Sequence, residues 1–178
     1  MSLHNHNHAK NHLSAKVITT GAIFTVLALI FSYIEFLIPI SIGVPGVKLG
    51  LANLVIIIAL YQMGFKWAVL IDGLRVVLAG LLFTGAFAML YSLAGASVSI
   101  LMMGLLKKTN RFSMIGVSMA GGVAHNFGQI VIAAIIVQTS QLFLYFPVLL
   151  FSGVIAGIAV GIVAVVLNDN LRKTVFRK

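Results

Sequence analysis

The sequence predicts an all-α, polytopic membrane protein of six transmembrane helices with both termini in the cytoplasm. Of its 178 residues, 61% are hydrophobic and 8% are charged, and the mean hydropathy is +1.13. A water-soluble domain does not need so much apolar surface. The net charge of +9 resides almost entirely in short stretches between or beyond the apolar runs. That distribution is typical of cytoplasmic loops and argues against a nucleic-acid-binding surface.

The first dozen residues alternate His and Asn, and we expect residues 1–12 to be a disordered leader or a purification tag rather than a metal site. Residues 13–178 then form a single six-helix transmembrane domain. The first apolar run is of full spanning length, so we expect it to be retained as a helix rather than cleaved as a signal peptide. Cysteine is absent, which excludes disulfides and thiolate chemistry.

The first predicted span, residues 17–38, carries a row of small residues three and four positions apart. Such a row lets another helix approach closely, either within this protein or from a partner protein. Glu35 lies near the far end of the span, where its carboxylate can reach water or a ligand. The row that could dock a partner consists of Gly21, Ala22, Thr25, Ala28 and Ser32.

Two prolines and two glycines between residues 39 and 48 predict a structured, non-helical loop that ends in Lys48. The next apolar run, residues 49–62, is only 14 residues long. An upright span needs about 20 residues. We therefore expect a short helix that is completed by the preceding loop.

The third and fourth predicted spans, residues 67–83 and 87–106, also contain polar groups. Asp72 and Arg75 are three residues apart, so on a helix they can form an ion pair that makes charge tolerable inside a membrane. A structural pair and a ligand contact both fit this spacing. Tyr91 and Ser92 lie near the start of the fourth span.

The fifth predicted span, residues 113–137, contains a polar cluster in the middle of its apolar run. His125 and Gln129 are four residues apart and share a helix face, and Asn126 lies about 100° away. Such groups face a ligand cavity or hydrogen-bond to neighbouring helices. The sixth span, residues 142–167, has glycines at four-residue spacing that predict a close-packing face: Gly153, Gly157 and Gly161.

Six spans place both termini on one side, together with the turns near Lys66 and Lys107. That side carries 10 Lys and Arg residues, whereas the opposite side has only Lys48. The asymmetry orients both ends toward the cytoplasm. Polar side chains from several helices then converge on the outward half and predict a pocket for an anionic or amide-bearing ligand. The predicted binding residues are Glu35, Lys48, Asn53, Arg75, Tyr91, His125, Asn126 and Gln129.

The run from Val44 to Leu60, followed by Met63-Gly64-Phe65-Lys66 and Asp72, resembles the substrate-binding S components of energy-coupling factor (ECF) vitamin transporters. This resemblance implies an S-component-like fold, a loop that covers an outward pocket, and a small-residue face that docks the T component. The segments 73–80, 92–96 and 116–129 resemble the Gx transporter group, often labelled heptaprenyl diphosphate synthase component I.

The acidic residues argue against catalysis by this chain alone. Prenyl diphosphate synthesis needs clustered aspartates that hold magnesium ions against a diphosphate. The chain has three acidic residues, Glu35, Asp72 and Asp169, spread over different regions. We therefore expect no enzymatic activity, no metal site and no cofactor. There is no phosphate-binding loop either, so any ATP hydrolysis must come from partner subunits.

The sequence thus predicts the substrate-binding subunit of an ECF-type importer for a small vitamin-like or quinone- or isoprenoid-precursor molecule. Its expected partners are the T component, two ATPase subunits and the lipid bilayer, and not nucleic acid. One alternative is a stand-alone secondary transporter or small channel, in which Asp72, Arg75 and His125 relay protons or ions. Another is a non-catalytic membrane subunit associated with heptaprenyl diphosphate synthase.

Overall fold

The computed structural model of the chain describes residues 3–38 and 49–174, with side chains for 15–38, 49–171 and 173. This part contains α-helices and two short helical segments but no strand, which confirms the predicted all-α class. The α-helices are α1 (Leu3–Leu37), α2 (Leu51–Gln62), α3 (Phe65–Ala79), α4 (Ala86–Thr109), α5 (Met114–Val137) and α6 (Phe146–Thr174). A π-helical turn, η1 (Gly80–Thr84), extends α3, and a 3₁₀-helix, η2 (Ser140–Tyr145), precedes α6. Because α1 begins at Leu3, it includes most of the predicted leader, whose origin stays a prediction.

Five helical segments within the described residues are long and apolar enough to cross a membrane, so the chain is a multi-pass membrane protein. The remaining predicted span, residues 49–62, corresponds to the short helix α2, which has 12 residues. At 1.5 Å per residue it is about 18 Å long, against a hydrocarbon core of about 30 Å. The five long segments are Ala15–Leu37, Phe65–Thr84, Ala86–Thr109, Met114–Val137 and Ser140–Leu171.

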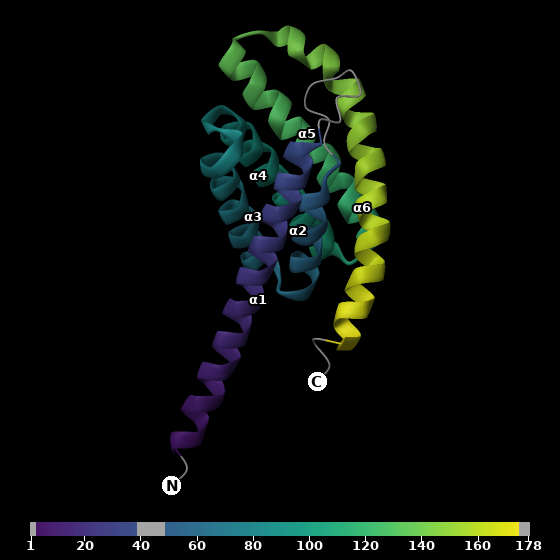
Figure 1. Cartoon of the computed structure of the whole chain (residues 1–178). Coiled ribbons are helices and arrows are strands. Elements are labelled where there is room, and N and C mark those ends of the chain that lie inside the picture. The colour runs from purple at the N-terminus through teal and green to yellow at the C-terminus, as the bar shows by residue number, and fades with distance from the viewer. Residues whose placement is uncertain (1–2, 39–48, 175–178) are drawn as a thin grey trace.

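The short helix α2 forms the centre of the bundle. Its residues 54–60 are all buried, and Ile56, Ile57 and Leu60 are among the most completely covered side chains of the structure. A helix that is apolar on every face is typical of a protein core. α1, α3 and α6 pack around α2, while α5 lies between α4 and α6 (Figure 1).

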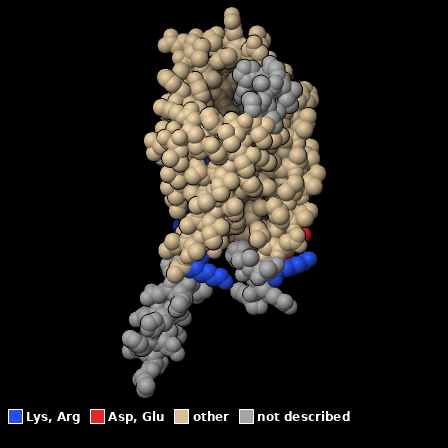
Figure 2. All heavy atoms as spheres, in the orientation of Figure 1, with Lys and Arg blue, Asp and Glu red and all other residues tan. Residues whose placement is uncertain are grey.

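Both ends of the described chain lie at the same end of the bundle, where α1 enters and α6 leaves (Figure 1). The Lys and Arg side chains visible in Figure 2 also gather mainly at this end. This arrangement is the one that the distribution of basic residues predicts. We call this the basic end of the bundle.

The glycines of α6 form the close-packing face that their spacing predicts, and α5 is the helix that they contact. A Cβ atom added to Gly157 would lie 2.6 Å from the Met119 Cα, and one added to Gly161 would lie 2.8 Å from the Ile115 Cα. Neither distance leaves room for a methyl group, because the neighbouring atoms belong to the backbone. The two helices therefore touch main chain to main chain.

The small-residue row of α1 mostly faces into the protein, and its role in partner docking stays a prediction. Gly21 is covered by the Trp67 ring, which would lie 2.8 Å from an added Cβ atom. Thr25 is buried and donates to the Gly21 carbonyl at 2.9 Å, and Ala28 is fully buried. Ser32 faces α3, and only Ala22 is exposed. Packing within the protein explains the row, because these small residues let α1 approach α2 and α3.

Candidate functional site

A cavity of about 260 Å³ lies in the half of the bundle away from the basic end. Its walls contain residues of every α-helix, and Figure 2 shows the surface hollowed at this end of the molecule. Pockets for small molecules measure roughly 300–1,000 Å³, so this volume suits a compact ligand. The polar residues of the wall are Ser32, Glu35, Asn53, Arg75, Thr84, Ser92, Ser118, His125 and Asn126.

Five of the predicted binding residues line this cavity: Glu35, Asn53, Arg75, His125 and Asn126. Two others, Tyr91 and Gln129, are not among the wall residues, and their contact with a ligand stays a prediction. The Gln129 side chain packs against Gly95 of α4, where an added Cβ atom would lie 2.8 Å from its Cγ. Tyr91 is replaced in the wall by its neighbour Ser92, which lies about 100° further round α4. Lys48 and the loop of residues 39–48 lie outside the described residues.

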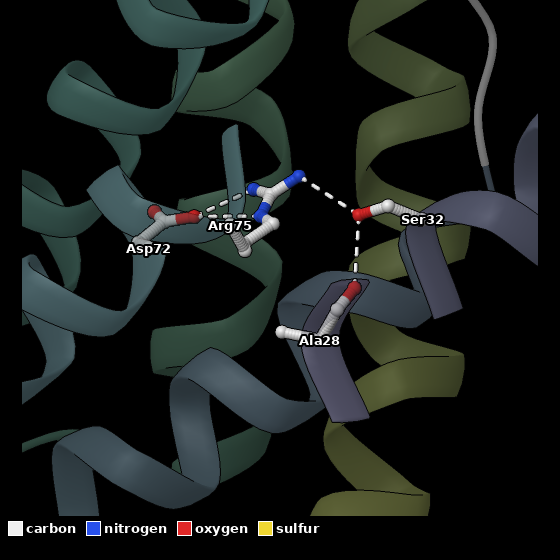
Figure 3. A network of polar contacts seen from close by, with 4 residues as sticks. All are labelled: Ala28, Ser32, Asp72 and Arg75. Carbon is white, nitrogen blue, oxygen red and sulfur yellow. Dashed lines mark hydrogen bonds and ion pairs between the residues drawn. The ribbon is translucent and has the colours of Figure 1, made fainter. Parts of the chain in front are cut away.

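The predicted ion pair of α3 is present. The Arg75 Nε and Nη2 atoms donate to Asp72 Oδ1 at 3.0 and 2.6 Å (Figure 3). Both side chains are buried, with 9% and 4% of their surfaces exposed. The Arg75 Nη1 atom also donates to Ser32 Oγ at 3.4 Å, and Ser32 donates to the Ala28 carbonyl. The guanidinium is thus neutralised by its own helix and connects α3 to α1.

Glu35 of α1 forms a cap on α2. Its Oε1 atom accepts hydrogen bonds from the backbone amides of Gly50 and Leu51 at 2.6 and 3.1 Å. The first amides of a helix have no partner within the helix, and the helix dipole favours a negative charge beside them. Gly50 adopts a left-handed conformation, with φ of 77°, and cannot supply a side-chain cap itself. The carboxylate therefore fixes the start of α2 to α1.

Asn126 and His125 are positioned by glycines and by α6. The Asn126 Nδ2 atom donates to the Leu149 carbonyl at 2.7 Å and to Ser152 Oγ at 3.3 Å. These bonds connect α5 to α6, so the amide nitrogen has a structural role. His125 is buried against α4, where a Cβ atom on Gly95 would lie 2.9 Å from its Nε2 atom. Gly95 therefore leaves the space that the imidazole occupies.

Sequence reasoning missed Ser118, which lies in the cavity wall and is 4% exposed. It precedes Gly122 by four residues and His125 by seven, the spacing of a single helix face. That spacing was the available signal. Together with Asn53 and Ser92, Ser118 makes no side-chain hydrogen bond to any residue that the structure describes.

A metal centre finds no support in the described part of the chain. No three His, Asp or Glu side chains come together there as candidate ligands. The acidic groups near the cavity are instead engaged with a helix N-terminus and with Arg75. The chemistry of the cavity wall is therefore hydrogen bonding by hydroxyl, amide and imidazole groups.

Residues 24–167 match the family model described as heptaprenyl diphosphate synthase component I. The chain belongs to this family. No curated protein and no solved structure matches the chain. The matched segment of the component I family includes every residue of the cavity wall, from Ser32 to Val160. It also confirms the resemblance that the segments 73–80, 92–96 and 116–129 suggest.

Proposed function

We propose that this component I family member is the substrate-binding membrane subunit of an ECF-type importer, an S component for a small vitamin-like or quinone- or isoprenoid-precursor molecule. The observation that supports this proposal is the cavity, whose wall contains residues of all six α-helices and polar side chains from α1 to α5. Polar groups are costly at membrane depth and normally face a protein interior or a functional cavity. A concave site with a few converging polar groups is the usual form of a small-molecule site.

The proposed topology places the basic end in the cytoplasm of a bacterial cell, as the positive-inside rule favours. The cavity then lies toward the outer face, and a ligand enters from outside. The chain crosses the membrane six times in this arrangement, with α2 as a short crossing surrounded by longer helices. Irregular or short elements are tolerated at membrane depth where other protein segments surround them.

Energy for release would come from partners, because the sequence has no phosphate-binding loop. The expected partners are a T component and two ATPase subunits. Of the small residues of α1 that could dock the T component, only Ala22 is exposed. We therefore expect α1 to contribute at most its outward face to that contact.

The family description supports a second candidate function, a non-catalytic membrane subunit of heptaprenyl diphosphate synthase. Two acidic groups have structural roles: Glu35 caps α2, and Asp72 pairs with Arg75. Among the described residues, no three His, Asp or Glu side chains come together as candidate ligands for a magnesium ion. This candidate predicts a stable complex with a soluble synthase component.

Native mass spectrometry distinguishes these functions. The protein would be co-expressed and gently purified with the T component and both ATPases, and separately with the soluble synthase component. The importer function predicts a complex in the first preparation alone, as for a known S component used as the control. A complex only with the synthase component would establish the second function. Uptake by the purified protein alone in liposomes under an ion gradient would instead identify a stand-alone transporter.

A further inference from the structure

The charged side chains of the cavity wall are engaged with other parts of the protein. The Glu35 carboxylate accepts two backbone amides of α2 through one oxygen. The Arg75 guanidinium directs two nitrogen atoms at Asp72 and a third at Ser32. The opposite charges of Asp72 and Arg75 cancel at a separation of 2.6 Å. Charge in this wall therefore holds α1, α2 and α3 together.

The groups without a protein partner are uncharged. Asn53, Ser92 and Ser118 line the cavity and make no side-chain hydrogen bond within the described residues. The Leu149 carbonyl can only accept a hydrogen bond, so it orients the Asn126 amide with the nitrogen toward Leu149. The Asn126 oxygen is then left to accept a further hydrogen bond. Amide and hydroxyl groups thus provide both donors and acceptors for a ligand.

The carboxylates and the guanidinium of the described wall do not sum to a positive charge. The pair of Arg75 and Asp72 contributes zero, and Glu35 contributes a negative charge that the α2 N-terminus offsets by about half an elementary charge. Among the described residues of the wall, an anion would lose its hydration without gaining a cation that is not already paired. An uncharged molecule exchanges its hydrogen bonds to water for bonds to the wall at little cost.

We infer that the cavity selects a small, uncharged polar molecule through Asn53, Ser92 and Ser118, and that it rejects diphosphates and carboxylates. This inference rests on the proposed function as a ligand-binding subunit. The sequence predicts a ligand that is either anionic or amide-bearing. The inference keeps the uncharged, amide-bearing class and excludes the anionic one. Among the candidate cargoes, an isoprenoid diphosphate does not fit, whereas an uncharged vitamin-like or quinone-precursor molecule does.

The charge of the ligand can be tested with the full-length protein in nanodiscs. A small-molecule extract of the host cells would be divided by ion exchange at neutral pH into uncharged, cationic and anionic fractions. Each fraction, and inorganic diphosphate as a defined anion, would be added before native mass spectrometry. We expect a bound mass from the uncharged fraction only. A bound mass from the anionic fraction or from diphosphate would overturn the inference. Loss of the mass bound from the uncharged fraction on changing Lys48→Gln would also overturn it.

The role of Ser118 can be tested against a matched control. Ser99 is also buried and without a hydrogen-bond partner in the described structure, but it does not line the cavity. Ser118→Ala should weaken binding of the uncharged fraction about three- to tenfold, the effect of one lost hydrogen bond. Ser99→Ala should bind like the unmodified protein. Equal affinities of the two variants would overturn the assignment of Ser118. Equal melting temperatures of the two variants would exclude misfolding as the cause of weaker binding by Ser118→Ala.

Failure of the inference and failure of the proposed function give different results. Binding from the wrong fraction retains a ligand-binding subunit but contradicts the uncharged ligand. No bound mass from any fraction, together with no complex with the energising subunits, contradicts the proposed function and the inference together.

Discussion

The two walls of the cavity are held together in different ways. On one side, α1, α2 and α3 are joined by charged groups: Glu35 caps α2, and Arg75 bridges Asp72 and Ser32. On the other side, α5 and α6 touch through glycines, and a Cβ atom on Gly122 would lie 2.6 Å from the Gly153 carbonyl oxygen. We call these the charged wall and the glycine wall.

The comparison shows that the most polar side chains are not the ones most available to a ligand. In the charged wall, the ionic groups form hydrogen bonds and an ion pair with other protein groups, because a buried charge is costly without a partner. In the glycine wall, main-chain packing leaves the nearby side chains of Ser118 and Asn126 with capacity for further hydrogen bonds. Charged groups thus hold the charged wall together, whereas Ser118 and Asn126 of the glycine wall keep capacity for hydrogen bonds to a ligand.

The largest expected effect comes from breaking the charged wall with Asp72→Asn. This change leaves the Arg75 guanidinium buried without its counter-charge, and we expect the free energy of unfolding to fall by about 3–5 kcal/mol. The double change Asp72→Asn/Arg75→Gln removes both charges and should cost clearly less. Thermal unfolding of both variants in the same detergent measures the difference. A single variant as stable as the double variant would contradict the neutralised pair.

A smaller effect is expected in the glycine wall from Gly157→Ala. The added methyl group would meet the Met119 Cα at 2.6 Å and force α5 and α6 apart, at a cost of about 1–3 kcal/mol. Gly73→Ala in α3 is the control, since nothing lies within 4 Å of its added Cβ atom. That variant should be neutral or gain up to about 1 kcal/mol from helix propensity. Similar melting temperatures for both would show that the helices do not touch as described.

The smallest effect is expected from the cap, through Glu35→Ala. Loss of the carboxylate leaves the Gly50 and Leu51 amides without this acceptor and should cost about 0.5–2 kcal/mol. Glu35→Gln keeps an acceptor oxygen and should cost less. Hydrogen exchange of the peptide that includes the start of α2 should accelerate most in the alanine variant. Unchanged exchange there would exclude Glu35 as the cap.

Sequence reasoning predicted the features that depend on local spacing. The apolar runs predicted the long helices and the short α2, and the interval from Asp72 to Arg75 predicted their ion pair. The four-residue spacing of Gly153, Gly157 and Gly161 predicted the face that meets α5. All of these depend on residues within one helix or on its length.

Features that depend on the meeting of helices could not be predicted. Glu35 accepts hydrogen bonds from amides 15 and 16 residues further along the chain. Residue spacing alone does not predict such a contact between two helices. The rotation of α4 about its axis decides that Ser92 faces the cavity and Tyr91 does not. Gln129 shares a face with His125 but packs against Gly95, because α4 covers that end of the face.

The most direct test of the central claim is whether filling the cavity prevents ligand capture. Ala156 of α6 lines the cavity, whereas Ala159, less than one turn away, is exposed. Native mass spectrometry would compare the mass bound by the unmodified protein, by Ala156→Leu and by Ala159→Leu after incubation with the uncharged extract. We predict an equal bound mass for the unmodified protein and Ala159→Leu and none for Ala156→Leu. An undiminished bound mass in Ala156→Leu would contradict the cavity as the binding site.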